Sequence, residues 1–305
     1  MQNKQRKSMI NVRRCFSESI GKSKCMMKMQ YDDFDERTRT QISNKLFGIL
    51  ETFLDNSASC GYNIQIYSSG DAGHNFCNAI FSDIFNKSVV LEEGNIFNWR
   101  KAYILIQEVI MYAESNEVLD ILWYINDWIN KNYCFNKKLF SELFNHLFEA
   151  EYVGYRFVNG KIVAITDRCE IDEIEQACCN PYSGCRAHIE KAVGFLADRE
   201  HKDYKNCIKE SISAVESVCK IIVGDEKATL GEAIKKLKEK GIKFHQALEK
   251  SFSMLFGYTS DEGGIRHAEG LFVSEVSFEE AKFMLISCSA FVNYLIAEYG
   301  KIKKG

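Results

Sequence analysis

The chain has 305 residues, of which 46% are apolar and 12% aromatic, so it is long enough for two domains that each bury a core. Its formal net charge of −3 excludes a uniformly basic surface, and any binding of nucleic acid would depend on a local patch. Pro181 is the only proline, which favours long helices with short connections, because helix interiors exclude proline.

The sequence predicts a cytoplasmic protein. The basic segment 1–7 is not followed by the apolar stretch that a signal peptide needs. The most apolar segment that we identify, Tyr103–Tyr112, is too short to cross a bilayer. The 12 cysteines are spread over a chain too large to need disulfides, so we expect free thiols in a reducing compartment.

The first half of the chain reads as a helical region behind a polar N-terminal arm. We expect Phe16–Ser19 to lie in a docked arm. Asp33 and Glu36 fit a capping box at the start of the first clear helix. The stretch 56–75 is rich in Asn, Ser and Gly and is expected to be a loop. Helical spacing of apolar residues then predicts helices at 76–91, at 97–113, after a capping Ser115, and at 138–151.

The period of the pattern changes at residues 152–166, which predict a β-hairpin. Asn159-Gly160 stands between two β-rich runs and supplies the positive φ angles of a type I′ turn. A short helix is expected at 172–178, and the turn-rich segment 180–184 is the best linker candidate. We therefore predict an N-terminal domain of residues 1–184 and a C-terminal domain of residues 185–305.

The C-terminal domain is predicted to be an antiparallel helical bundle, which makes the whole chain mainly α. Short loops between long helices make sequential neighbours antiparallel. Capping boxes at Thr229/Glu232 and Ser277/Glu280 mark two helix starts. The expected helices cover 186–198, 203–223, 230–240, 245–256 and 278–299.

The polar, glycine-containing segment 257–268 differs from the apolar helices on either side of it. Arg266 is a permanently charged planar donor suited to phosphate, and His267 can exchange protons near neutral pH. The residues alone favour a simpler interpretation, in which Arg266 caps a helix or pairs with Asp261 or Glu262.

Both halves of the sequence resemble known families. The run 203–216 resembles the HEPN superfamily, in the branch attached to bacterial abortive-infection proteins, and segments 227–231, 256–261 and 264–268 fit it too. The first half resembles the fourth class of N-terminal domain of AbiJ-like proteins. That likeness depends on Phe16–Glu18, Gln30–Asp35, Trp123–Trp128, Phe144–Asn145, Glu149 and Gly154–Arg156.

The HEPN resemblance implies a bundle of four or five helices, usually dimeric, and in many members a metal-independent ribonuclease of phage defence or toxin systems. The family signature is an Arg, a polar neighbour and a closing His. Arg266 matches the Arg and His267 the polar neighbour, whereas Leu271, Phe272 and Val273 occupy the positions where the closing His would fall. Arg266 would then bind the scissile phosphate and His267 would act as the acid or base.

Two functions stay open at this point. One is an anti-phage abortive-infection effector that is a metal-independent HEPN endoribonuclease acting on RNA through Arg266 and His267. The other is a non-catalytic HEPN module that dimerises and binds RNA or protein, with the N-terminal domain as sensor. The expected partners are RNA, a second copy bound through the C-terminal bundle, and a phage or antitoxin protein. We expect no cofactor and no membrane contact.

Three further groups of residues have competing interpretations. Cysteines and a histidine near the linker suggest zinc, but adjacent cysteines rarely both point inward, so no metal site is expected; the residues are Cys178, Cys179, Cys185 and His188. The lysine run 235–240 is expected to be a solvated helix face, and would be the basic neighbour of any bound RNA. Trp123 and Trp128 fit core packing, with a partner-binding face as the alternative.

Overall fold

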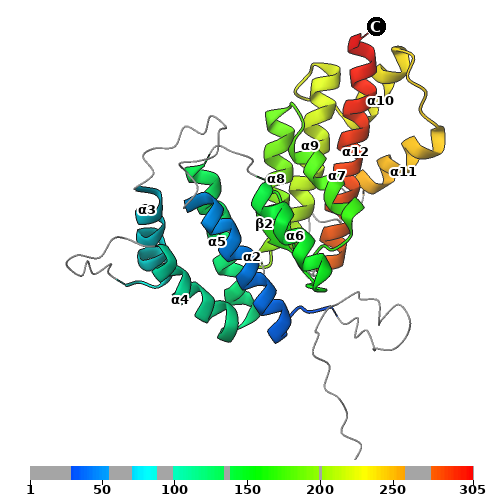
Figure 1. Cartoon of the computed structure of the whole chain (residues 1–305). Helices are drawn as coiled ribbons and strands as arrows, with labels where there is room; N and C mark the ends of the chain where they lie inside the picture. The colour runs from blue at the N-terminus through cyan, green and yellow to red at the C-terminus, as the bar shows by residue number, and fades with distance from the viewer. Residues whose placement is uncertain are drawn as a thin grey trace, which may run out of the picture. The chain divides into compact units, whose positions relative to one another are not determined.

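The computed structural model describes residues 29–54, 71–87, 99–133, 138–198, 201–257 and 276–304 (Figure 1). This part of the chain is mainly helical with one two-stranded antiparallel hairpin, which confirms the predicted fold class. The chain divides into two compact units, Met1–Ile162 and Val163–Gly305. The predicted docked arm at Phe16–Ser19 lies outside the described residues.

The N-terminal unit is built from helices that surround an aromatic core. Its helices are α2 (Glu36–Leu54), α3 (Asp71–Ala79), the π-helical turn η2 (Ile80–Ile84), α4 (Trp99–Tyr112), α5 (Ser115–Asn132) and α6 (Leu139–Ala150). The predicted helices at 97–113, after Ser115 and at 138–151 are therefore confirmed.

The prediction was wrong at both ends of the helix expected at 76–91. Residues 71–75 were expected to be loop but are helical, and the helix expected to reach 91 ends in η2 at Ile84. The physical reason is tertiary: Phe76 is fully buried against Trp128 of α5, with ring centroids 5.1 Å apart. Burial of this ring overrides the loop-like composition of the residues before it.

The start of α2 differs from the predicted Asp33/Glu36 capping box. The carboxylate of Asp35 is the cap, since it accepts a hydrogen bond from the Thr38 amide at 2.8 Å. Asp33 instead accepts one from the buried Arg39 at 3.0 Å. The residue that the local pattern favoured as the cap therefore pairs with the buried Arg39, six residues further on.

Ser115 was likewise predicted to cap α5, and this was wrong. Glu114 is the N-cap and forms a capping box with Glu117. The Ser115 hydroxyl donates to the Asp32 carbonyl at 2.8 Å, so it joins the start of α5 to the segment before α2.

A cluster of phenylalanines holds the hairpin against α6. Phe140, Phe144 and Phe148 recur every four residues on α6 and are at most 2% exposed. They pack on Phe157 in strand β1 (Arg156–Val158), which pairs with β2 (Lys161–Val163). The turn residues Asn159 and Gly160 have φ angles of 46° and 74°, which confirms the predicted hairpin turn.

The segment before α2 adds to the same region as a single parallel bridge between Gln30 and Val153. The Gln30 amide donates to the Tyr152 carbonyl, and the Gly154 amide donates to the Gln30 carbonyl, both at 2.8 Å. The ring of Tyr31 lies so close to Gly154 that an added Cβ atom would be 2.2 Å from it. A glycine is therefore required at position 154.

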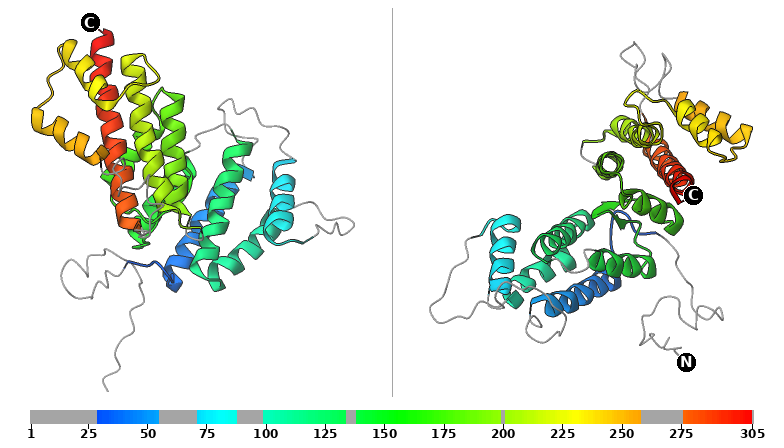
Figure 2. Two further views of the ribbon diagram at one scale, coloured as in Figure 1. Left: turned by 180° about the vertical axis from the view of Figure 1, so that it is seen from behind. Right: turned by 90° about the horizontal axis from the view of Figure 1, so that it is seen from above.

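The C-terminal unit is a bundle of long helices. Its elements are α7 (Arg168–Cys178), α8 (Ser183–Ala197), α9 (Tyr204–Val223), α10 (Leu230–Glu239), α11 (Gln246–Gly257) and α12 (Phe278–Lys304). In Figures 1 and 2, α8, α9 and α12 run side by side, and α7 packs on α12. The helical segments predicted for this half of the chain are confirmed.

Local capping predictions hold in this unit. The Thr229/Glu232 capping box is present at the start of α10. The Ser277 hydroxyl accepts from the Glu280 amide at 3.1 Å at the start of α12. One predicted apolar row of α9 is buried along its whole length: Ile208, Ile212, Val215, Cys219 and Ile222.

Helix α12 is long as well as apolar, which the sequence patterns did not bring out. Among the described residues, Phe278–Ile302 is the one helix long and apolar enough to cross a membrane by length and composition. In the unit, however, α12 packs on α7, α8 and α9, and Met284, Leu285 and Val292 are at most 1% exposed. These contacts make α12 a core helix of the bundle.

The segment predicted as a linker is a short turn between α7 and α8, mostly exposed but anchored by the buried Asn180. Asn180 is 6% exposed; its amide nitrogen donates to the Ala177 carbonyl at 2.6 Å, and its oxygen accepts from the Tyr182 amide at 2.7 Å. Both flanking helices pack within the C-terminal unit. The domain boundary at residue 184 stays a prediction, while the division between compact units lies at 162/163.

Candidate functional site

Arg266 and His267 lie outside the described residues, in the connection between α11 and α12. The two helices that flank this connection are held together by aromatic stacking. Phe252 of α11 lies parallel to Phe291 of α12 with centroids 3.5 Å apart, and Phe244, just before α11, meets Tyr294 edge-on at 5.8 Å. The helix before the predicted site thus contacts the helix after it.

The start of α12 is anchored beside the start of α9. Phe278 packs edge-on against Tyr204 with centroids 5.9 Å apart. One turn later, the buried Cys207 thiol donates to the Ala281 carbonyl at 3.9 Å. Burial raises the pKa of Cys207 to about 12, so it is a neutral packing group at physiological pH. These contacts bring the end of the α11–α12 connection to the helix that carries the longest HEPN-like run.

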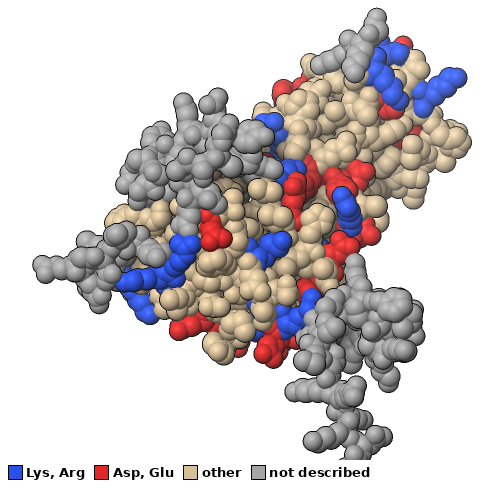
Figure 3. All heavy atoms as spheres, viewed as in Figure 1, with Lys and Arg blue, Asp and Glu red and all other residues tan. Residues whose placement is uncertain are grey.

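The lysine run on α10 is only partly the solvated face that we predicted. Lys235 and Lys240 are exposed. Lys236 donates to the Val223 carbonyl at the end of α9, at 2.5 Å, and Lys238 pairs with Glu249 of α11. In the face shown in Figure 3, Lys and Arg atoms gather at the end of the unit that carries the C-terminus.

A polar cleft of about 600 Å³ lies along α8 and α9, and the sequence analysis did not find it as a site. His188 of α8 and Glu210 of α9 meet with Nδ1 and Oε2 2.6 Å apart, both side chains partly exposed. A carboxylate in this position orients the imidazole for proton exchange. The pair joins residues 22 apart on different helices, so no local spacing could have indicated it.

The charge of that cleft argues against RNA as its ligand. Glu216, Asp225 and Glu226 line it, and Lys220 is the only lysine or arginine among the described lining residues. Lys220 itself lies 3.9 Å from Glu226. A phosphate backbone would meet net repulsion here, and proton exchange at His188 is therefore not assigned to RNA cleavage.

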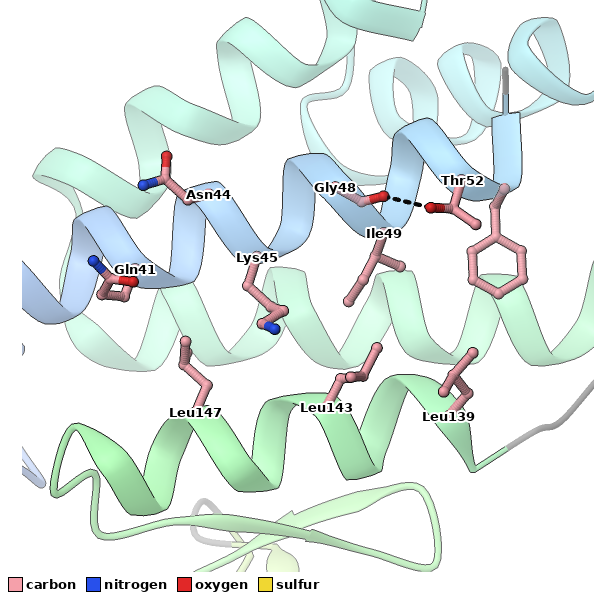
Figure 4. A pocket seen from close by; sticks show the side chains of 10 residues that line it. Gln41, Asn44, Lys45, Gly48, Ile49, Thr52, Leu139, Leu143 and Leu147 are labelled. Atoms are coloured by element: carbon pink, nitrogen blue, oxygen red, sulfur yellow. Dashed lines mark hydrogen bonds between the residues drawn. The ribbon is translucent and has the colours of Figure 1, made fainter. Parts of the chain in front are cut away.

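A second hollow of about 440 Å³ lies between α2 and α6 in the N-terminal unit (Figure 4). Leu139, Leu143 and Leu147 of α6 point toward α2 across it. On the α2 side, an added Cβ atom at Gly48 would meet nothing within 4 Å. The sequence did not lead us to predict this groove. The signal was there, because the leucines recur every four residues beside the buried row of Phe140, Phe144 and Phe148.

The residues considered for zinc are engaged separately. Cys185 is fully buried, burial raises its pKa to about 11, and its sulfur accepts from Asn180 at 3.4 Å. Cys179 is exposed and His188 is bound to Glu210. Across the ranges that the structure describes, no three His, Cys, Asp or Glu side chains are grouped to hold a metal ion.

The two tryptophans of α5 have different environments. Trp128 is half-buried and packs edge-on against Phe76 and Tyr133. Trp123 is 39% exposed, and the ammonium group of Lys161 lies 4.7 Å from its ring centroid. Ring packing therefore engages Trp128, while Trp123 contacts the start of β2 by a cation–π interaction.

A family model described as AbiJ N-terminal domain 4 matches residues 14–180, more than half of the chain. The chain belongs to this family. AbiJ domains are found in abortive-infection proteins, so the family is one of anti-phage defence. The match runs from the segment before α2 through α7, and leaves α8–α12 outside it. No curated protein and no solved structure gives a significant match to the chain.

Proposed function

We propose that this AbiJ-family chain is an abortive-infection effector whose C-terminal bundle is a metal-independent HEPN endoribonuclease. The packing of the start of α12 on the start of α9 supports it most. Residues 204–216 of α9 belong to the longest run that resembles the HEPN superfamily, and the start of α12 directly follows the connection that contains Arg266. The contact between these two helix starts is the observation that supports the proposal.

The proposed reaction is cleavage of RNA by its own ribose. Arg266 binds the scissile phosphate, and His267 removes the proton of the 2′-hydroxyl, whose oxygen attacks phosphorus. The bond from phosphorus to the 5′-oxygen breaks, and that oxygen takes up a proton. The products are a 2′,3′-cyclic phosphate and a 5′-hydroxyl. In a helix, adjacent side chains point about 100° apart, so the proposal has Arg266 of one copy act with His267 of a second copy across a dimer.

The test is RNA cleavage by the purified full chain, with and without EDTA. We expect cleavage in EDTA, cyclic phosphate ends, and about a hundredfold loss of rate in Arg266→Ala, as for loss of one donor to a transition-state charge. Arg168→Ala is the matched control, because Arg168 is 82% exposed and its nearest carboxylate contact is 3.9 Å away. An Arg266→Ala protein that cleaves RNA at the wild-type rate would rule out this mechanism.

A non-catalytic HEPN module is the second candidate, favoured by Leu271, Phe272 and Val273 at the positions of the closing His. In that case the bundle binds RNA or a phage or antitoxin protein without cutting RNA. His267→Ala separates the two functions, with the 80% exposed His201 as control. Loss of cleavage in His267→Ala alone supports the nuclease; RNA binding by a wild-type chain that never cleaves supports the module.

A further inference from the structure

We infer that the groove between α2 and α6 is the docking site of this chain's own N-terminal arm, residues 12–28. The groove presents a half-buried row of leucines, Leu139, Leu143 and Leu147, beside the buried Ile49 (Figure 4). Because α2 carries a glycine at position 48, the space above the row is open to another side chain. Covering an apolar surface of this kind with a further apolar group removes it from water and stabilises the protein.

The described chain begins one helical turn from this groove. The side-chain amide of Gln30 donates to the Thr38 hydroxyl at 2.9 Å and to the Glu151 carbonyl at 2.7 Å. Gln41 and Leu147 line the near end of the groove. Thr38 lies three residues before Gln41, and Glu151 lies four residues after Leu147. The arm therefore leaves a fixed point at that end.

The arm has the right pattern and length to cover the leucine row. Val12, Phe16 and Ile20 recur every four residues, as the three leucines do. The first and last members of each row are eight residues apart in the sequence. In helical form that separation is about 12 Å for both the arm and the leucine row. The residues between Ile20 and Gln30 span about 30 Å when extended, far more than one helical turn requires.

The family match begins at residue 14, so most of the arm belongs to the AbiJ domain itself. The arm is mostly basic and Lys45 lines the groove, so the docking depends on apolar contact and not on charge. The arm is thus the occupant that the geometry and the apolar spacing favour together.

The experiment is limited trypsin digestion of the full chain, followed by mass spectrometry of cuts after the arm's basic residues. We expect Leu143→Asn and Phe16→Ser to be cut about tenfold faster than wild type, because proteolysis follows the population of the undocked arm. Ile104→Asn is the matched control, since Ile104 is 56% exposed on α4, outside this groove. Its arm should be cut at the wild-type rate.

Hydrogen exchange of wild type keeps the inference testable if a variant fails to fold. Docking predicts slowed exchange of residues 12–20 in the full chain. Exchange of these amides at the rate of an unfolded peptide, or equal cutting in all four proteins, would overturn the inference. A groove variant that alters the sedimentation coefficient while leaving arm cleavage unchanged would instead assign the groove to a second copy.

Discussion

The two units of this protein stabilise their helices by different means. The N-terminal unit packs large aromatic rings in its core, such as Phe76, Phe144 and Phe157, and includes buried charged groups such as Arg39 and Glu151. The centre of the C-terminal unit is packed by a row of aliphatic side chains and thiols on α9, with ring contacts at the start of α12 and between α11 and α12. Aromatic rings and buried ions need specific partners, whereas aliphatic rows need only the right spacing. The first unit should therefore be the less tolerant of substitution.

The largest effect is expected from Phe144→Ala in the aromatic cluster. Phe144 is fully buried and contacts the rings of Phe140, Phe148 and Phe157. Removing its ring should lower the free energy of unfolding by about 4 kcal/mol, measured by urea denaturation. Ile212→Val in α9 should cost about 1 kcal/mol. Equal losses in the two variants would erase the contrast between the units.

The next effect concerns the buried ion pair at the end of α6. Glu151 accepts two hydrogen bonds from Arg37, at 2.7 and 3.0 Å, and its side chain is 4% exposed. Glu151→Gln removes the charge that compensates Arg37 and should lower stability by about 3 kcal/mol. Glu51→Gln is the control, because Glu51 and its partner Arg100 are both more than 40% exposed and should contribute about 0.5 kcal/mol.

The thiols of the C-terminal unit predict sensitivity to alkaline pH. Burial raises the pKa of Cys207, Cys219 and Cys288 from 9.0 to about 12. Between pH 9 and 12 the unfolded chain loses protons that the folded chain retains, so stability falls as the pH rises.

Each thiol should cost about 1.4 kcal/mol for each pH unit in that window. Denaturation at pH 8 and pH 10 measures the loss, and Cys219→Ala should lose correspondingly less. The exposed Cys169, changed to alanine, is the control that should leave the pH dependence as it was. A pH-independent stability up to pH 10 would contradict burial of these thiols.

The smallest effect tests which residue caps α2. Asp35→Ala removes the hydrogen bond to the Thr38 amide and should cost about 1 kcal/mol. Asp33 is 85% exposed, and Arg39 retains bonds to the Phe34, Ile110 and Ala113 carbonyls, so Asp33→Ala should cost about 0.3 kcal/mol. If thermal denaturation showed a larger loss of stability for Asp33→Ala than for Asp35→Ala, then Asp33 would be the cap, as the sequence predicted.

The same contrast explains what could be predicted from the sequence. In the C-terminal unit, the cap at Thr229 and the apolar row of α9 depend on residues three or four apart, and both were predicted correctly. In the N-terminal unit, the caps at Asp33 and Ser115 were predicted wrongly. Asp33 accepts a hydrogen bond from the side chain of Arg39 instead of capping α2. Ser115 donates to the carbonyl of Asp32, more than 80 residues away in the sequence, instead of capping α5.

The sites show the same limit. Arg266 and His267 were singled out by residue type and by resemblance, both of which can be recognised in a linear sequence. The α2–α6 groove and the His188–Glu210 pair could not be predicted, because each needs two helices to be brought together. Hydrophobic spacing predicts that a helix face is buried, but not which helix covers it.

The position of α12 has a consequence for synthesis on the ribosome. Because α12 packs on α7, α8 and α9, these helices expose their apolar rows until residues near 300 have left the exit tunnel. The N-terminal unit includes no later segment than its hairpin and can complete folding while translation continues. The bundle proposed to be harmful to its own cell is thus completed after the N-terminal unit.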